Sequence, residues 1–329
     1  MASSKYNAKT SGVTLVNEFA STIKDKVILV SGTSPGSIGA LYCHAIASAK
    51  PAMLILAGRT QEKTAQTAST LRGSHPNIKV KELLVDFASF DSVRSAATEV
   101  MGWADVSHLD LLVSNAAIMA PPYRKTVDGH EAQWQTNHLG PWLFVNLVME
   151  KVMASESPRV VLVSSDGHRM HPIRWADYDF SDGKTYNKWS AYGQSKTAVC
   201  LTAVALAKRL GGKGLKVYSL HPGIVVTSNL SRDLDMMDKD LVTFNAADVA
   251  MGNKFMHGGL TFKTEDEITA THIFASFSED LNDYNGYYLM DCHVADQWNE
   301  EVWPWAINRI EAERLWALNE KMLGQEFRY

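Results

Sequence analysis

Cysteine is scarce in this chain, which has only Cys43, Cys200 and Cys292 among its 329 residues. An odd and sparse count provides no disulfide framework, and no two of the three have the spacing of a metal site. Cys43 and Cys200 lie among apolar residues in segments that we expect to be helical. Free cysteine there behaves as a small buried hydrophobe, so the pattern favours a reducing compartment and no metal.

Long apolar runs and an excess of positive charge are also missing. No window approaches the roughly 18 apolar residues of a membrane span, and residues 1–22 lack the apolar core of a signal peptide. The formal net charge is −4 and the pI is about 6.3, whereas nucleic-acid and membrane-surface partners favour a basic face. We therefore expect a cytoplasmic protein with a small-molecule partner, no nucleic acid and no membrane span.

Short apolar runs alternate regularly with helical stretches along most of the chain. The first run, KVILVS at 26–31, is rich in β-branched residues and ends at glycines, which is typical of a buried strand. Strands are expected at 26–31, 52–57, 80–85, 109–114, 159–164 and 215–220, with a last, edge strand at 286–290. Helices are expected at 38–49, 61–72, 89–101, 133–153, 192–210 and 264–274. This order predicts an α/β fold, a single Rossmann-type doubly wound parallel sheet with helices on both faces.

Other segments surround this predicted domain, which spans 26–290. Residues 1–25 form either a poorly ordered arm or a short helix near 16–23. Residues 224–263 break the alternation; a segment this long is typical of a substrate lid, and core packing or an oligomer contact are the alternatives. Residues 291–329 form a helical extension that we expect to dock on the core rather than to be a binding surface. It contains Trp298, Trp303, Trp305 and Trp316.

A glycine-rich loop, GTSPGSIG at 32–39, joins the first expected strand to a helix. Glycines at this place let the backbone approach a pyrophosphate, and the helix N-terminus offers free N–H groups. Such a loop alone is a weak signal, but its position after the first strand of a β–α alternation indicates nucleotide binding. We expect Gly32, Ser34, Gly36 and Ile38 to contact the cofactor.

The second expected strand ends at Arg59, where NAD-specific sites place a carboxylate for the ribose 2′-hydroxyl. No carboxylate occurs between Ala52 and Gln61. The planar guanidinium of Arg59 suits a 2′-phosphate instead. This pattern favours NADP(H); a solvated arginine at a helix start is the alternative.

The stretch YGQSK places Tyr192 and Lys196 four residues apart in an expected helix. Residues at this spacing share a helix face. A lysine charge about 4 Å from the phenol would be worth about 4 kcal/mol at an effective dielectric constant of about 20, or about three pKa units. We therefore expect Lys196, together with an oxidised nicotinamide ring, to lower the pKa of Tyr192 toward neutrality, as exchange of a proton with a carbinol oxygen requires.

The ordered motifs resemble those of the short-chain dehydrogenase/reductase family from about residue 25 to 289. They are the glycine loop, Asp86, SNAA at 114–117, Asn137 in TNHLG, VSS at 163–165, Tyr192 with Lys196, and HPG at 221–223. The resemblance implies hydride transfer between NADP(H) and an alcohol or carbonyl compound. It also implies that the catalytic residues are Asn137, Ser165, Tyr192 and Lys196.

Each matching position then has an implied role. Tyr192 would donate the proton in reduction, and Lys196 would hold the ribose. Ser165, or its neighbour Ser164, would bind the carbonyl oxygen, and Asn137 would hold a water molecule of the proton relay. The implied cofactor contacts, besides the loop and Arg59, are Asp86 at the adenine, Asn115 and Ala116 at the ribose, and Pro222, Gly223 and Thr227 at the nicotinamide. For each, loop or core packing is the alternative.

The 27-residue gap between Ser165 and Tyr192 is wide for this family, and the insert is similar to the branch of retinol dehydrogenases and the WW-domain oxidoreductase. That resemblance implies bulky apolar substrates, such as steroids, terpenoids, polyketides or retinoids. His168 and His171 lie in the insert, and we expect a structural or solvent role for them. The glycine loop is one residue longer than the family pattern, so Gly36 or Ser37 takes its middle place.

Two other classes of function remain open. One is a non-redox isomerase or cyclase on the same scaffold, and the other is a nucleotide-sensing regulator without turnover. The intact set of Ser165, Tyr192 and Lys196 favours the oxidoreductase. A homo-oligomer is compatible with the family resemblance, but no sequence feature sets its size.

Overall fold

The computed structural model describes the chain except residues 1–4, 226–229, 231–238, 254–261 and 300. Its centre is one eight-stranded sheet in the order β3-β2-β1-β4-β5-β6-β7-β8, parallel except for the last pair. The strands are β1 (Val27–Ser31), β2 (Met53–Gly58), β3 (Lys79–Leu84), β4 (Leu111–Ser114), β5 (Arg159–Val163), β6 (Lys216–His221), β7 (Tyr288–Met290) and β8 (His293–Val294). The doubly wound α/β prediction is confirmed.

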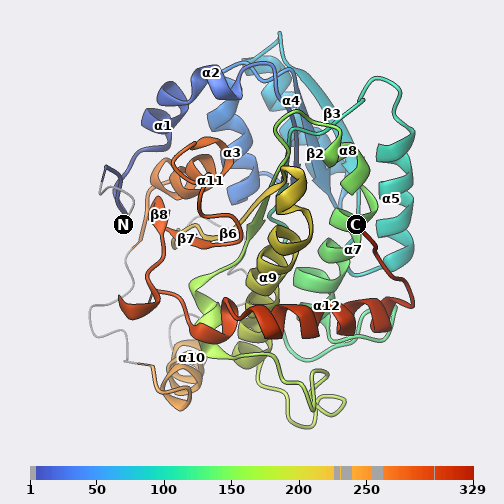
Figure 1. The fold of residues 1–329 in the computed structure, drawn as a ribbon, viewed down its shortest axis with the longest axis vertical. Coiled ribbons are helices and arrows are strands. Elements are labelled where there is room, and N and C mark those ends of the chain that lie inside the picture. Colours follow the sequence, from blue (N-terminus) through green and yellow to red (C-terminus); the bar gives the residue numbers. More distant parts are fainter. Residues whose placement is uncertain (1–4, 226–229, 231–238, 254–261, 300) are drawn as a thin grey trace.

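Helices cover both faces of the sheet (Figure 1). One apolar cluster includes residues of α1 (Gly12–Glu18), α2 (Ala20–Ile23), α3 (Ile38–Ala47), α4 (Gln61–Ser74) and α11 (Glu267–Phe277). The other includes residues of α5 (Phe90–Gly102), α6 (Ala132–Trp134), α7 (Gly140–Leu147), α8 (Met149–Met153), α9 (Lys188–Leu210) and α12 (Arg309–Leu323). Strand residues alternate between the two clusters: Leu29 joins the second, whereas Ile28 and Val30 join the first.

The strand order reverses direction between β1 and β4, which is the topological switch point of the sheet. From β1 the chain continues through β2 and β3 on one side, and then returns to β4 on the other. Ligands of doubly wound folds bind at the carboxyl ends of the strands beside such a switch. The glycine loop after β1 and Asn115 after β4 both lie at this edge.

The long helix expected at 133–153 is broken into three parts. A π-helical turn, Gln135–Leu139, separates α6 from α7, and α8 follows after Val148. The Asn137 side chain in this turn accepts a hydrogen bond from the backbone N–H of Ile118 (2.8 Å) and donates to its carbonyl (2.9 Å). These tertiary contacts widen the helix at a residue that the sequence places in the catalytic set.

Two other expectations need correction. The last expected strand is not the edge, because β8 pairs with β7 in antiparallel register inside the predicted extension. For the N-terminal segment the helical alternative agrees with the structure, which has two short helices there and buries Leu15 and Ile23 fully. Segment 224–263 is not irregular throughout, since it contains α10 (Lys239–Ala250). Among the described residues, we find no helix with the length and apolarity that crossing a membrane requires.

The C-terminal extension docks on the core, as expected. Helix α12 lies across α9 in Figure 1. Trp316 is buried against the Trp142 ring, with 4.8 Å between ring centroids, and the Arg209 guanidinium lies 4.0 Å from the centroid of its ring. Arg209 also makes two hydrogen bonds of 2.8 and 2.9 Å to Glu313. Trp298 differs from these residues, because it is 84% exposed.

Candidate active site

One cavity of about 490 Å³ runs along the carboxyl ends of the parallel strands. Loops after β1 to β6 all contribute to its lining. It brings together most of the residues that the sequence analysis selected. They are Gly32, Ser34, Ile38, Arg59, Asp86, Asn115, Ala116, Ser165, Tyr192, Lys196, Pro222 and Gly223.

Two glycines of the loop are required by close backbone contacts. A Cβ on Gly32, whose φ is +74°, would lie 2.8 Å from the Cα of Ala116. A Cβ on Gly39 would lie 2.6 Å from the Gly32 carbonyl oxygen. These contacts leave the loop backbone bare at the start of α3, which is the surface that a pyrophosphate needs.

The extra residue of the loop is accommodated by Gly36, which does not line the cavity. Its φ is +73°, so it makes the turn. Ser37 lines the cavity instead and caps α3, accepting a hydrogen bond from the Ala40 N–H (3.2 Å) and donating one to the Gly32 carbonyl (2.7 Å). Ser37 therefore occupies the middle place of the glycine motif. The sequence had left the choice between Gly36 and Ser37 open.

Asn115 ties the ends of β1 and β4 together. Its side-chain amide donates to the Ser31 carbonyl (3.0 Å), and its backbone N–H donates to the Ser31 hydroxyl (3.0 Å). The same hydroxyl accepts from the Ala116 N–H (3.1 Å). Asn115 and Ala116 thus have a structural role as well as a place in the cavity wall.

Two cations lie at the end of the cavity beside β2. Arg59 and Lys63 are both exposed and both line the cavity. Lys63 is in the first turn of α4, four residues after Arg59, and this closeness in sequence could have identified it as a second cation. Asp86 is turned into its own loop, where its carboxylate accepts from the Ala88 N–H (2.9 Å).

Tyr192 and Lys196 lie one turn apart on α9, and both are almost fully buried (3% and 2% exposed). The Lys196 ammonium donates to the Val163 carbonyl (3.0 Å) and lies 5.7 Å from the centre of the Tyr192 ring. Burial raises the pKa of Tyr192 to about 12, partly offset by a hydrogen bond with Ser165. Desolvation of the phenol therefore exceeds any effect of Lys196 alone, and the joint effect of the lysine and an oxidised nicotinamide ring stays a prediction. Burial also lowers the pKa of Lys196 to about 8.

The two neighbouring serines have different surroundings. The Ser165 hydroxyl oxygen accepts from the Gly167 N–H (2.9 Å), inside the 3₁₀ turn Asp166–Met170. The Ser164 hydroxyl donates to the Lys196 carbonyl (2.8 Å) and accepts from the Cys200 thiol (3.2 Å). Ser164 is therefore engaged in packing α9 against β5, which favours Ser165 as the residue that meets a substrate.

Asn137 lies behind the cavity rather than in its wall. Besides its two bonds to Ile118, its amide donates to the Ser195 hydroxyl (3.0 Å), which in turn donates to the Tyr192 carbonyl (2.7 Å). Asn137 is thus linked to the backbone of the helix that carries Tyr192.

The loop after β6 forms another part of the cavity wall. A Cβ on Gly223 would lie 2.6 Å from the Lys263 side chain, whose ammonium pairs with Asp291 at 2.6 Å. Pro222 and Gly223 line the cavity, whereas Thr227 lies outside the described residues.

The wall beyond Tyr192 is apolar. Met170, Trp189 and Tyr192 form a buried cluster with Ala120 and Ala247, and Met119 and Phe244 pack against it. The Trp189 and Phe244 rings meet edge-on, with 5.1 Å between their centroids. The sequence analysis missed Trp189 and Phe244, because only the tertiary fold brings α10 to the start of α9.

Helix α10 is attached to the site by two ion pairs. The Arg169 guanidinium makes bonds of 3.0 and 3.1 Å to the buried carboxylate of Asp248. Lys188, the first residue of α9, pairs with Asp240. Part of the segment expected to be a lid therefore packs over the apolar wall.

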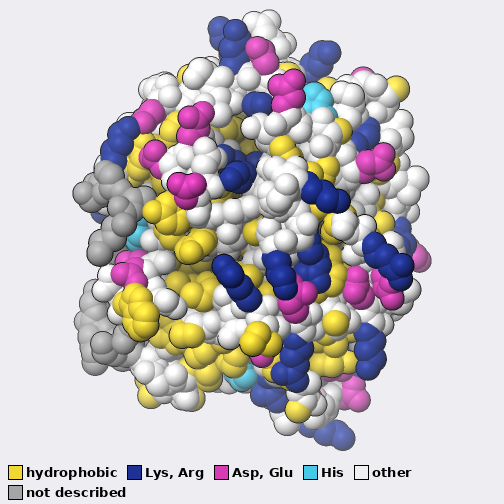
Figure 2. Space-filling model, viewed as in Figure 1, with side chains coloured by type: hydrophobic (Ala, Val, Ile, Leu, Met, Phe, Trp, Pro, Cys, Tyr) yellow, Lys and Arg dark blue, Asp and Glu magenta, His cyan; other side chains and the backbone are white. Residues whose placement is uncertain are grey.

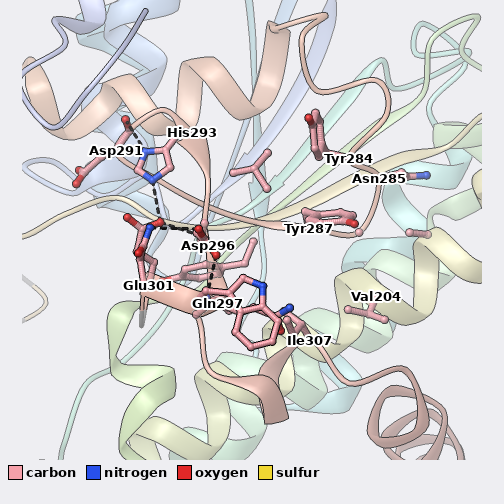
Figure 3. Close-up of a pocket in the computed structure, with 18 of the residues that line it drawn as sticks. Val204, Tyr284, Asn285, Tyr287, Asp291, His293, Asp296, Gln297, Glu301 and Ile307 are labelled. Atoms are coloured by element: carbon pink, nitrogen blue, oxygen red, sulfur yellow. Dashed lines mark hydrogen bonds and ion pairs between the residues drawn. The ribbon is translucent and has the colours of Figure 1, made fainter. Parts of the chain in front are cut away.

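A larger hollow of about 1290 Å³ lies between β7, β8, α9 and the segment before α12. Figure 2 shows hydrophobic side chains gathered on this part of the surface, and Figure 3 shows the hollow itself. His293, Asp296 and Glu301 point toward one another at its edge. No residue of the predicted catalytic or cofactor set lines it, so the smaller cavity is the candidate active site.

Comparison with known proteins agrees with this geometry. The sequence profile of the short chain dehydrogenases matches residues 26–238. The chain belongs to the short-chain dehydrogenase/reductase family. Members of this family interconvert alcohols and carbonyl compounds with a nicotinamide cofactor.

Relatives also place this dehydrogenase in the retinol-dehydrogenase-like branch. It is 32% identical to mouse retinol dehydrogenase 14 over 91% of this chain and 86% of that protein. It is 31% identical to the oxidoreductase calI of Penicillium decumbens, over 92% and 88%. A Mycobacterium paratuberculosis protein of solved structure, described as uncharacterized, has 26% identity and a TM-score of 0.70 over 94% of this chain and 97% of that chain.

Proposed function

We propose that this dehydrogenase uses NADP(H) to transfer a hydride between the nicotinamide and a secondary alcohol or ketone of a fairly large apolar molecule. The observation that carries the proposal is one continuous cavity with Arg59 and Lys63 at one end and Ser165, Tyr192 and an apolar wall at the other. A carboxylate at the Arg59 position would favour NAD(H) instead.

The chain's residues fit this cofactor along its whole length. Gly32 and Gly39 keep the loop backbone open for a pyrophosphate, since a Cβ at either position would collide with neighbouring backbone. Arg59 and Lys63 offer charge for a 2′-phosphate. Lys196 and Gly223 line the opposite end, where the ribose and nicotinamide would lie.

In the reductive direction the bound nicotinamide would supply the hydride that adds to the carbonyl carbon. Tyr192 would give its phenolic proton to the carbonyl oxygen, so that one hydride and one proton convert C=O to CH–OH. Because burial raises the pKa of Tyr192 to about 12, the phenol holds this proton at neutral pH. The Ser165 hydroxyl, held by Gly167, would orient the carbonyl oxygen, and the buried Lys196 charge would stabilise the phenolate that forms.

The substrate class follows from the wall beside Tyr192. Trp189, Met170 and Phe244 offer an apolar surface with few polar groups, which suits a bulky apolar carbonyl compound. The relatives named retinol dehydrogenases support a retinoid-like shape, and steroids, terpenoids and polyketides share the same apolar character. A cytoplasmic location and the oligomeric state stay predictions.

The test follows NADPH oxidation and alcohol formation by the purified chain with a panel of retinal, a steroid ketone, a terpenoid ketone and acetone. We expect NADPH consumption in step with product, and kcat/KM values that rise with apolar size. Product formed without NADPH consumption would support the isomerase alternative, and NADPH binding without turnover across the panel would support a sensor.

Gly167→Ala is expected to reduce turnover by about 10- to 100-fold, since a displaced reacting group can cost about that much. A Cβ on Gly167 would lie 2.7 Å from Cε1 of the Tyr192 ring, so the ring must move. Gly102→Ala is the control, because nothing lies within 4 Å of its Cβ. Steady-state kinetics of both variants check this, and equal kcat values would show that Tyr192 tolerates the shift.

A further inference from the structure

Two buried histidines beside catalytic residues form hydrogen bonds with the C-terminal extension. His168 follows Ser165 by three positions, and His138 directly follows Asn137. The partner of His168 is the backbone N–H of Trp303, at 3.2 Å. The partner of His138 is the side chain of Asn319 in α12, at 2.9 Å. The reaction described above uses neither histidine.

The partners of His168 determine its tautomer. Its Nδ1 lies 2.8 Å from the Ser165 carbonyl oxygen, which can only accept, and its Nε2 faces the Trp303 N–H, which can only donate. Nδ1 therefore carries the proton and donates to Ser165, while Nε2 accepts from Trp303. Burial lowers the pKa of His168, which favours the same neutral ring.

The turn that contains His168 sets the position of the Ser165 hydroxyl. The Ser165 carbonyl also accepts from the His168 backbone N–H (3.1 Å), and the Ser165 hydroxyl accepts from the Gly167 N–H (2.9 Å). A change at the His168 ring would thus alter the support of the hydroxyl that meets the substrate.

The extension is fixed at points away from the catalytic cavity. The Trp305 indole donates to the His168 carbonyl (3.1 Å), and Glu301 joins His293 at 3.0 Å and the Asp296 N–H at 2.8 Å, as Figure 3 shows. These bonds hold the chain on both sides of residue 303, through Glu301 before it and Trp305 after it.

We propose that His168 is a positioning residue that couples the C-terminal extension to Ser165, so that turnover depends on the backbone N–H of Trp303. The proposal rests on the carbonyl reductase activity proposed above. The extension would then be part of the catalytic apparatus rather than only a cover for the core.

Two matched substitutions at residue 303 isolate the N–H group. Trp303 has a φ of −82°, close to the value that proline adopts, so Trp303→Pro removes the donor with little change of φ. Trp303→Ala removes the same indole but keeps the N–H. We expect Trp303→Pro to lower kcat by about 10- to 100-fold with an unchanged KM for NADPH, and Trp303→Ala to keep most of the turnover.

The histidine itself is tested with a rescue. His168→Phe removes both ring nitrogens and should lower kcat as Trp303→Pro does, whereas His168→Asn keeps a donor near Nδ1 and should restore part of the loss. The double variant His168→Phe/Trp303→Pro should be no slower than either single variant, because both break one connection. His272→Phe, at another buried histidine, is the control for loss of stability.

Activities are divided by the concentration of NADPH-binding sites, so that unfolded protein does not count. Equal kcat values per site in Trp303→Pro and Trp303→Ala, or no rescue by His168→Asn, would overturn the proposal. Wild-type protein without turnover would overturn the reductase function instead. In that case nuclear magnetic resonance still decides: the amide signal of Gly167, the donor to Ser165, should differ between Trp303→Pro and Trp303→Ala, which lack the same indole, and equal spectra would overturn the coupling.

Discussion

Tyr192→Phe is expected to lower kcat/KM for carbonyl reduction by about 10²- to 10⁴-fold, the usual contribution of a positioned general acid. The substitution removes one oxygen and leaves the ring in its buried place between Met170 and Gly167. The Ser165 hydroxyl would then be the proton donor left beside the substrate oxygen in the proposed arrangement, and it must itself be reprotonated. Hydride transfer would stall because charge would build up on the carbonyl oxygen.

Stopped-flow and steady-state kinetics with NADPH check this result, and thermal unfolding shows whether the fold is intact. Tyr287→Phe is the matched control, because Tyr287 is 47% exposed and lines only the larger hollow. Turnover within a few-fold of wild type in Tyr192→Phe would refute the assignment of the proton donor, even if NADPH binds normally.

The pH dependence gives an independent check on the same residue. Since burial raises the pKa of Tyr192 to about 12, the protonated phenol needed for reduction persists through neutral and mildly alkaline pH. A phenol whose pKa Lys196 alone lowered to neutrality would instead lose reductive activity above about pH 7. The two readings differ because desolvation depends on burial, which the spacing of Tyr192 and Lys196 does not reveal.

Strand and helix order were predictable because they follow from local patterns. Short apolar runs predicted the parallel strands, and the position of Gly32 after the first of them predicted the phosphate loop. The two-residue strand β8 was too short to have any periodicity. Its pairing with β7 is a property of the assembled sheet edge.

The π-helical turn at Asn137 could not be read from the sequence for a different reason. Residues 133–153 have an ordinary helical pattern, but Asn137 exchanges hydrogen bonds with the backbone of Ile118, which is 19 residues away. Gly140 also approaches the Phe87 carbonyl so closely that a Cβ would not fit. Long-range contacts of this kind override a local helical preference, and here they do so at a functional residue.

Arg59→Ala is expected to weaken NADPH binding by roughly 10- to 150-fold while leaving NADH binding unchanged, since hydrogen bonds to a charged group are worth about 1.5–3 kcal/mol. Arg59 is exposed, lies at the end of the cavity beside β2, and forms no ion pair with any described residue. Its guanidinium is therefore available for a 2′-phosphate, a group that NADH lacks.

Fluorescence titration of both nucleotides against wild type, Arg59→Ala, Lys63→Ala and the double variant measures this selectivity. Arg72→Ala is the control, because Arg72 is at the other end of α4 and pairs with Glu82. Loss of selectivity in Lys63→Ala rather than Arg59→Ala would move the phosphate contact from the loop after β2 to the first turn of α4. Equal binding of NADH and NADPH by the wild type would remove the NADP(H) assignment but leave the catalytic cavity unaffected, because the cations and Tyr192 are at opposite ends of it.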